Sequence, residues 1–157
     1  MQRLRVIRYR GTADDRLGTV IQDRGAAASP RGPSGGVGAG EVGNFIVTAH
    51  RTTAGGPLLR LPSMRRGEHV LVRYGGLVYE YRVSRTLRVS FRSARSRASQ
   101  SASVPGRPGV PATRPMITLS TCATPEDHVA GNYWSDALGH PEHRIDKIGV
   151  LVDVRRA

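Results

Sequence analysis

The sequence has few of the residues that build covalent cross-links or membrane spans. Cys122 is the one cysteine among 157 residues, which excludes an intrachain disulfide. There is no apolar run of the ~18 residues that a membrane helix needs, and no secretory signal pattern. The single thiol is therefore a buried small side chain, a link to a partner or a reactive group.

Lysine and carboxylates are also scarce. Lys147 is the only lysine, so arginine supplies nearly all of the positive charge behind a formal net charge of +12. Such a surface should associate with anionic polymers or lipid head groups in a salt-dependent way, but no nucleic-acid-binding motif accompanies the charge, so no specific nucleic acid is expected. No acidic residue lies between Glu80 and Glu126, and the five histidines lack the paired spacing of zinc sites. We expect neither a metal nor a cofactor.

Aromatic residues make up only 5% of the chain, whereas 19 glycines and 10 prolines punctuate it. This composition favours short strands joined by turns over long helices. Strands are expected in six segments: 17–22, 45–49, 69–74, 77–83, 116–122 and 144–154. Gly75-Gly76 predicts a hairpin between the third and fourth of them. The expected fold is an all-β closed barrel of about eight strands, with one or two short helices and long loops.

The remaining segments define the expected domain organisation. Residues 1–16 begin with an arginine-rich stretch and form a basic tail or an edge strand, and residues 17–157 form one catalytic or binding domain. Residues 25–40, rich in glycine, proline and alanine, predict an extended surface loop. Residues 91–115, rich in serine, arginine and proline, predict a long mobile loop.

Three chemically useful side chains stand at the ends of predicted strands. His50 follows one apolar strand, Cys122 ends another and Arg144 begins the last. Barrel closure can bring such ends to one rim, so a separation in sequence does not prevent a Cys/His pair. Taken singly, a strand-end cysteine is more often a packed small side chain, and a strand-end histidine is more often structural.

The surrounding residues favour the catalytic interpretation. Residues 118–122 (TLSTC) match the TLxTC signature of sortases, residues 48–51 (TAHR) resemble their histidine segment, and Arg144 resembles the arginine that opens their last strand. The resemblance extends over residues 42–154 and is closest to the class E sortases of actinobacteria. It implies a cysteine transpeptidase, a thiol protease by chemistry, with Cys122 as nucleophile, His50 as acid and base, and Arg144 as stabiliser of the oxyanion.

The resemblance also implies partners and a location. The substrates would be surface proteins that carry a C-terminal LAxTG- or LPxTG-like sorting motif, cleaved at a Thr-Gly-type bond. The acceptor would be an amine of a peptidoglycan precursor or a pilin lysine, so that proteins are anchored to the cell wall or linked as pilus subunits. The enzyme would act at the cell surface, on the extracytoplasmic face of the membrane, through an anchor segment absent from these residues.

Substrate contacts are expected close to these three residues. The candidates are Thr48, Arg51, Thr121, Tyr133 and Trp134, although the two aromatic residues could belong to the core instead. A thiol of pKa ~8.5 beside an imidazole of pKa ~6.5 leaves only about one per cent as the thiolate–imidazolium pair. Cationic neighbours such as Arg144 and Arg51 would lower the thiol pKa and enlarge that fraction.

Two other functions remain open from the sequence. A basic β-barrel could hold a peptide or nucleic acid without turnover, in which case Cys122 would be an inert buried thiol. A cysteine peptidase would use the same three residues but hydrolyse its substrate without an amine acceptor.

Overall fold

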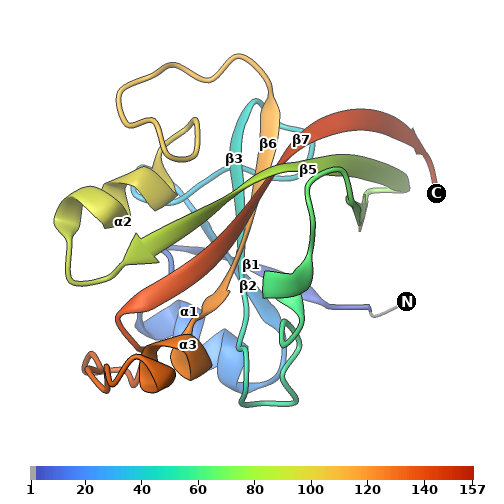
Figure 1. Cartoon of the computed structure of the whole chain (residues 1–157). Coiled ribbons are helices and arrows are strands. Elements are labelled where there is room, and N and C mark those ends of the chain that lie inside the picture. The colour runs from blue at the N-terminus through green and yellow to red at the C-terminus, as the bar shows by residue number, and fades with distance from the viewer. Residues whose placement is uncertain (1–2) are drawn as a thin grey trace.

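The computed structural model describes residues 3–157, which form one curled seven-stranded sheet with helices packed around it (Figure 1). The strands are β1 (Val6–Arg10), β2 (Ala27–Arg31), β3 (Gly43–Thr48), β4 (His69–Tyr74), β5 (Leu77–Ser90), β6 (Pro115–Cys122) and β7 (His143–Arg156). The helices are α1 (Arg16–Asp23), α2 (Ala94–Ser101), α3 (Thr124–Val129) and a 3-10 turn, Leu61–Ser63. Met1 and Gln2, the start of the predicted N-terminal segment, lie outside the described residues.

The sheet has the order β1-β2-β3-β6-β7-β5-β4. The pairs β1/β2 and β3/β6 are parallel, and the other pairs are antiparallel. The all-β, barrel-like prediction is confirmed, with seven strands where the sequence suggests about eight and with more helix than expected. The predicted hairpin is also confirmed: Tyr74 pairs with Leu77 across Gly75 and Gly76, whose φ angles of 58° and 78° fit a tight turn that only glycine adopts easily.

Strands β3 and β6 are buried on both faces, but the two faces differ in chemistry. One face carries the apolar core, in which Phe45, Val47, Ile117 and Leu119 pack with Tyr81. Side chains alternate along a strand, so the residues between them point to the opposite face. That face, here called the polar face, carries Asn44, Thr48, Thr118 and Ser120 beside the apolar Ile46, and α1 and α2 contact it.

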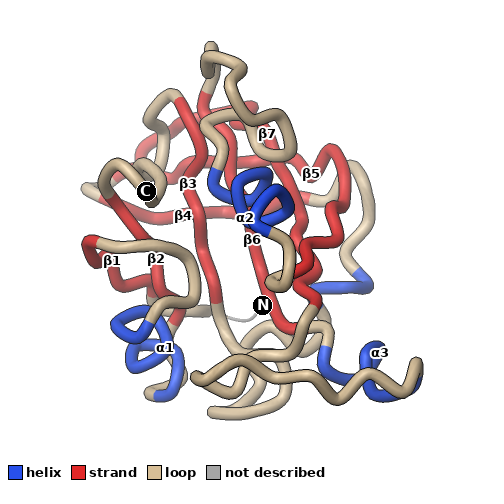
Figure 2. The backbone as a smooth tube through the Cα atoms, turned by 90° about the vertical axis from the view of Figure 1, so that its left-hand side faces the viewer, coloured by secondary structure: helices blue, strands red, loops and turns tan. Residues whose placement is uncertain are grey.

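The polar face is held by hydrogen bonds to α1 and α2. Gln22 of α1 donates from Nε2 to Thr48 Oγ1 at 2.9 Å, and Gln100 of α2 donates from Nε2 to Ser120 Oγ at 3.0 Å. In Figure 2, α2 lies in front of β6. Asn44 Nδ2 also donates to the Gln100 carbonyl at 2.9 Å. Both helices are therefore fixed to the sheet by buried amides rather than by apolar packing alone.

The strand predicted for residues 17–22 is wrong, because these residues form most of α1. Asp15 caps the helix, accepting a hydrogen bond at Oδ1 from the Gly18 amide at 2.8 Å. Thr19 and Gln22, one helical turn apart, face the protein, whereas Leu17 is 60% exposed. The apolar and β-branched residues that suggest a strand thus lie partly on the outer side of a capped helix.

Two predicted loops are also interrupted by regular structure. Within residues 25–40, β2 lies between β1 and β3, and the small side chains of Ala27, Ala28 and Ser29 are fully buried there. Within residues 91–115, Ser93 caps α2 by accepting a hydrogen bond from the Ser96 amide at 3.2 Å. The composition of both segments is loop-like, and tertiary contacts override it.

Helices α1 and α3 lie at the end of the sheet where β6 ends, and the connection between α2 and β6 lies at the opposite end (Figure 1). In the part of the chain that the structure describes, no helix is long and apolar enough to cross a membrane.

Candidate active site

His50, Cys122 and Arg144 come from the same end of three neighbouring strands. Cys122 is the last residue of β6 and pairs in register with Arg144, the second residue of β7. Strand β3 runs parallel to β6 with Thr48 opposite Ser120, and His50 follows two residues later, as Cys122 follows Ser120. The structure therefore brings the ends that carry all three predicted catalytic residues together.

The Arg144 guanidinium is completely buried and has partners on two of its three nitrogens. Nε donates to Asp14 Oδ2 at 2.9 Å and Nη1 donates to the Pro141 carbonyl at 3.0 Å, while the Phe91 ring centroid lies 3.9 Å from Cζ. Nη2 is buried and makes no hydrogen bond to any described residue. A buried donor without a partner is rare, so Nη2 is a group available to a ligand.

The Cys122 side chain is 8% exposed, and burial raises the pKa of its thiol to about 11. Arg144 and Arg51 lower this pKa, as the sequence suggests, whereas Asp14 and Asp136 raise it further. The expectation that the cations would bring the net pKa down is wrong, because the desolvation of the buried thiol outweighs them. In this conformation Cys122 is a neutral thiol at neutral pH.

His50 is paired with a carboxylate of α1. Its Nε2 lies 2.7 Å from Asp23 Oδ1, and the two side chains are 12% and 61% exposed. Among residues 3–157, no hydrogen bond joins His50 to Cys122. The ring is therefore oriented by Asp23, with Nδ1 left without a hydrogen-bond partner among the described residues.

Arg51 contacts the backbone of Cys122 rather than solvent. Its Nη1 donates to the Cys122 carbonyl at 3.2 Å, its Nε donates to the Leu59 carbonyl at 2.9 Å, and two of its nitrogens contact both carboxylate oxygens of Glu126. The Arg51 hydrogen bond lowers the pKa of Glu126. Arg51 thus ties the end of β6 to α3, and its predicted substrate contact stays a prediction that this geometry does not favour.

Thr48 and Thr121 are buried, at 1% and 2% exposure. Thr48 Oγ1 is bonded to Gln22, and Thr121 Oγ1 donates to the Ala49 carbonyl at 2.8 Å. Thr121 precedes Cys122 on the strand, so the alternation of side chains turns it to the other face of β6. Both threonines have the surroundings of structural supports, and their contact with a peptide also remains untested.

Tyr133 and Trp134 lie in the connection between α3 and β7. Tyr133 is 70% exposed and stacks on His128 with ring centroids 4.5 Å apart. Trp134 is half-buried, with the Arg92 guanidinium 5.6 Å from its ring centroid. Both side chains are accessible to a ligand, which is compatible with the predicted groove wall.

Comparisons with known proteins identify the family of the chain. Residues 23–137, more than half of the chain, match the family model described as the sortase domain. The chain belongs to the sortase family. This enzyme is therefore a cysteine transpeptidase, and Cys122 is its only cysteine. A comparison with curated protein sequences found no match.

Solved structures show the same fold as this sortase at low sequence identity. The SrtA sortase of Actinomyces oris has a TM-score of 0.69 and 20% identity, over 96% of this chain and 71% of that one. Sortase E1 of Streptomyces coelicolor, solved with a tripeptide in its active site, has a TM-score of 0.69 and 18% identity, over 96% and 81%. Sortase E of Streptomyces avermitilis has a TM-score of 0.66 and 19% identity, over 96% and 79%.

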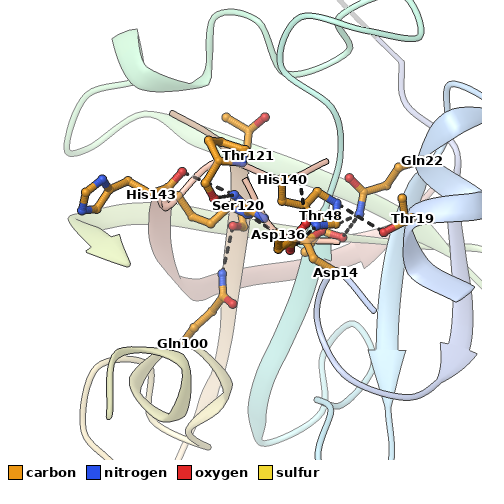
Figure 3. A network of polar contacts seen from close by, with 12 residues as sticks. Asp14, Thr19, Gln22, Thr48, Gln100, Ser120, Thr121, Asp136, His140 and His143 are labelled. Carbon is orange, nitrogen blue, oxygen red and sulfur yellow. Dashed lines mark hydrogen bonds and ion pairs between the residues drawn. The ribbon is translucent and has the colours of Figure 1, made fainter. Parts of the chain in front are cut away.

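The sequence alone does not reveal the residues that surround Arg144 in this sortase. Asp14, Gln22 and Thr48 form one chain of hydrogen bonds, and Thr19, His140 and Asp136 form another (Figure 3). Burial raises the pKa of Asp14, but Arg144, His140 and Gln22 lower it by more, so this carboxylate is ionised. In the sequence, the one sign of this arrangement is the acidic pair Asp14-Asp15, which precedes α1. The pair is not recognised as the start of a helix when residues 17–22 are predicted as a strand.

The described residues contain no group of three or more His, Cys, Asp and Glu side chains arranged to hold a metal ion.

Asp146 is a second buried carboxylate, on the polar face of the sheet. Its two oxygens accept hydrogen bonds from Gln100 Nε2 at 3.1 Å and 3.3 Å. Burial raises its pKa to about 7, partly offset by hydrogen bonds from Ser120 and Gln100. A carboxyl whose pKa is higher in the folded state binds its proton more tightly there. Folding stability from this group is therefore greatest at low pH and falls as pH rises from about 4 to about 7.

Asp146→Asn should remove this pH dependence. We expect the variant to gain stability over the wild type as pH rises from 5 to 8, by up to about 1.4 kcal/mol per unit of pKa shift. Urea unfolding at both pH values measures the difference in stability between variant and wild type. The control is Asp153→Asn, which changes an exposed carboxylate on the same strand, β7. An equal difference at pH 5 and pH 8 would show that the buried carboxyl titrates normally.

Proposed function

We propose that this sortase cleaves a Thr-Gly-type bond in an LAxTG- or LPxTG-like sorting motif and transfers the acyl group to an amine, using Cys122, His50 and Arg144. The unpartnered Arg144 Nη2 carries the proposal, because it is a buried donor in register with the only thiol. A charged donor left free beside a thiol is the arrangement that stabilisation of an oxyanion requires.

The first half of the reaction forms a thioester. His50 accepts the Cys122 proton, and the thiolate attacks the threonine carbonyl, whose oxygen becomes an oxyanion. Arg144 Nη2 donates a hydrogen bond to that oxyanion and balances its charge. His50 then gives its proton to the leaving glycine amine as the C–N bond breaks.

The second half releases the enzyme. An acceptor amine attacks the thioester carbonyl, His50 removes the amine proton, and the tetrahedral intermediate collapses with Cys122 as the leaving group. The leaving thiolate takes up the proton from His50, so acid and base roles alternate and no cofactor is consumed.

The substrate must displace part of the closed site. Cys122 is 8% exposed and Arg144 is fully buried, so a carbonyl reaches Nη2 only after the side chains that cover it move. A pocket of about 360 Å³ opens beside Phe91, the residue that stacks on Arg144. Its other lining residues are Thr12, Ala13, Ser34, Arg97, Ala98, Gln100 and Ser101.

This pocket is our candidate for binding the extended sorting motif, as the Streptomyces coelicolor sortase binds a tripeptide in its active site. The substrates would be surface proteins with a sorting motif, and the acceptor an amine of a peptidoglycan precursor or a pilin lysine. We propose that the enzyme acts at the extracytoplasmic face of the cell membrane.

Cleavage of fluorogenic LAxTG and LPxTG peptides, with and without oligoglycine, tests the proposal. We expect a ligated product that needs both the amine and Cys122 and is absent in Cys122→Ala. Hydrolysis that is unaffected by the amine would instead identify a peptidase. Turnover that survives in Cys122→Ala would refute the assignment of the nucleophile.

A further inference from the structure

One short segment supplies a carboxylate to two of the three proposed catalytic residues. Asp14 lies two residues before α1, and Asp23 is the last residue of α1. Asp14 Oδ2 accepts from Arg144 Nε at 2.9 Å, and Asp23 Oδ1 lies 2.7 Å from His50 Nε2. Among the described residues, no other carboxylate pairs with either Arg144 or His50.

The contact with Asp14 determines which arginine nitrogen is left to meet a substrate. The Asp14 and Arg144 side chains are 4% and 0% exposed, so solvent does not compete for the pair. With Nε on Asp14 and Nη1 on the Pro141 carbonyl, the plane of the guanidinium is fixed and Nη2 remains. Without Asp14, the guanidinium could rotate and any of its donors could be lost to other partners.

Asp14 is itself held from α1 (Figure 3). Gln22 Nε2 donates to Asp14 Oδ1 at 2.6 Å and also to Thr48 Oγ1 on β3 at 2.9 Å. The carboxylate is therefore locked between the helix, the sheet and the arginine. Asp14 has a φ of 59°, a conformation that asparagine also adopts readily, so an Asn replacement keeps the backbone while it removes the charge.

The contact with Asp23 determines which ring nitrogen of His50 is left for the thiol. A carboxylate only accepts hydrogen bonds, so Nε2 carries the proton and the neutral ring has its lone pair on Nδ1. Nδ1 makes no hydrogen bond to any described residue and is the nitrogen that can accept the Cys122 proton. Orientation of a histidine by a carboxylate is a recurrent way of selecting the tautomer that acts as a base.

We propose that α1 is a positioning element of the active site, in which Asp14 orients Arg144 for the oxyanion and Asp23 selects the tautomer of His50. The inference rests on the proposed function and names two residues that act through others. It differs from a purely structural role for the helix, because it predicts losses in turnover without loss of fold.

Asp23 gives the sharper test, because its side chain is 61% exposed and can be changed without opening the core. We expect Asp23→Asn and Asp23→Ala to lower kcat about 10- to 100-fold with little change in KM, and Asp23→Glu to recover most of it. An amide can donate to Nε2 and stabilise the wrong tautomer, so Asn should be no better than Ala. Asp153→Asn, another exposed carboxylate, is the matched control.

A spectroscopic measurement separates this inference from the proposed function. The ¹⁵N chemical shifts of the His50 ring should report Nε2 protonation in the wild type and a shifted tautomer ratio in Asp23→Ala, whether or not a substrate has been found. An active wild type, with kcat and tautomer both unchanged in Asp23→Ala, would overturn the role of Asp23. An inactive wild type with the expected tautomer change would overturn only the proposed reaction.

Asp14 is tested by a double-mutant cycle with Arg144→Lys. Asp14→Asn should lower kcat about 10- to 100-fold in the wild type but much less in Arg144→Lys, since the residue acts through the guanidinium. Equal losses in both backgrounds would overturn its role. If Asp14→Asn does not fold, Gln22→Met is the second test, because it leaves the Asp14–Arg144 ion pair in place but removes the Gln22 hydrogen bond that holds Asp14. This variant should still lower kcat several-fold, and unchanged turnover would count against the proposal equally.

Discussion

Arg144→Lys is expected to lower kcat/KM about 10²- to 10³-fold, the usual cost of losing one oxyanion donor. Lysine keeps the positive charge that the buried Asp14 carboxylate needs, so the fold should survive. The guanidinium spreads its donors over three nitrogens, however, whereas an ammonium group carries its three N–H donors on one nitrogen at the end of a flexible stem. It cannot bond Asp14 and the Pro141 carbonyl and still present a further N–H where Nη2 lies.

The measurement is steady-state cleavage of the sorting peptide, with the thermal midpoint recorded for each variant. Arg155→Lys is the matched control, because Arg155 is an arginine on the same strand with a side chain 46% exposed. We expect the control to keep wild-type activity. Near-normal activity of Arg144→Lys, in a folded protein, would assign the oxyanion contact to another donor.

The three catalytic candidates could be predicted from the sequence because each stands at a strand boundary that local patterns mark. Residues 118–122 combine a buried strand with the motif, and the register of β6 with β7 then places Cys122 opposite Arg144. The Gly75-Gly76 hairpin is equally local, since the positive φ angles it needs are a property of glycine. Such features require no knowledge of distant contacts.

The surroundings of the site could not be predicted in the same way, because they depend on contacts between distant residues. Asp14 and Arg144 are separated by 130 positions and Gln100 and Asp146 by 46. The helix α1 has an apolar, β-branched composition that outweighs the signal of its Asp15 cap in the sequence, and its contacts through Gln22 with the polar face of β3 are visible only in the structure. The same is true of α2, whose serine- and arginine-rich sequence suggests a loop until Gln100 is seen buried against β6.

Burial of the Cys122 thiol has the largest consequence that the sequence does not reveal. With a thiol pKa of about 11, the thiolate fraction of Cys122 is about 10⁻⁴ at pH 7 and about 10⁻¹ at pH 10. The rate of alkylation by a small neutral reagent should therefore rise about tenfold per pH unit over this range, about 1,000-fold in total. Since a raised pKa favours the neutral thiol, the rise continues to pH values at which an ordinary cysteine is already ionised.

The same protein unfolded in urea is the control, because exposure returns the thiol to an ordinary pKa and its alkylation rate should level off near pH ~9. A native rate that levels off by pH 8 would mean that Arg144 and Arg51 outweigh burial and that the free enzyme already holds an activated thiolate. A continued rise means instead that the thiol is activated only when the substrate is bound. Displacement of the side chains that bury Arg144, including Phe91, would then be part of the catalytic cycle. The exposed guanidinium would stabilise negative charge on both the sulfur and the oxyanion.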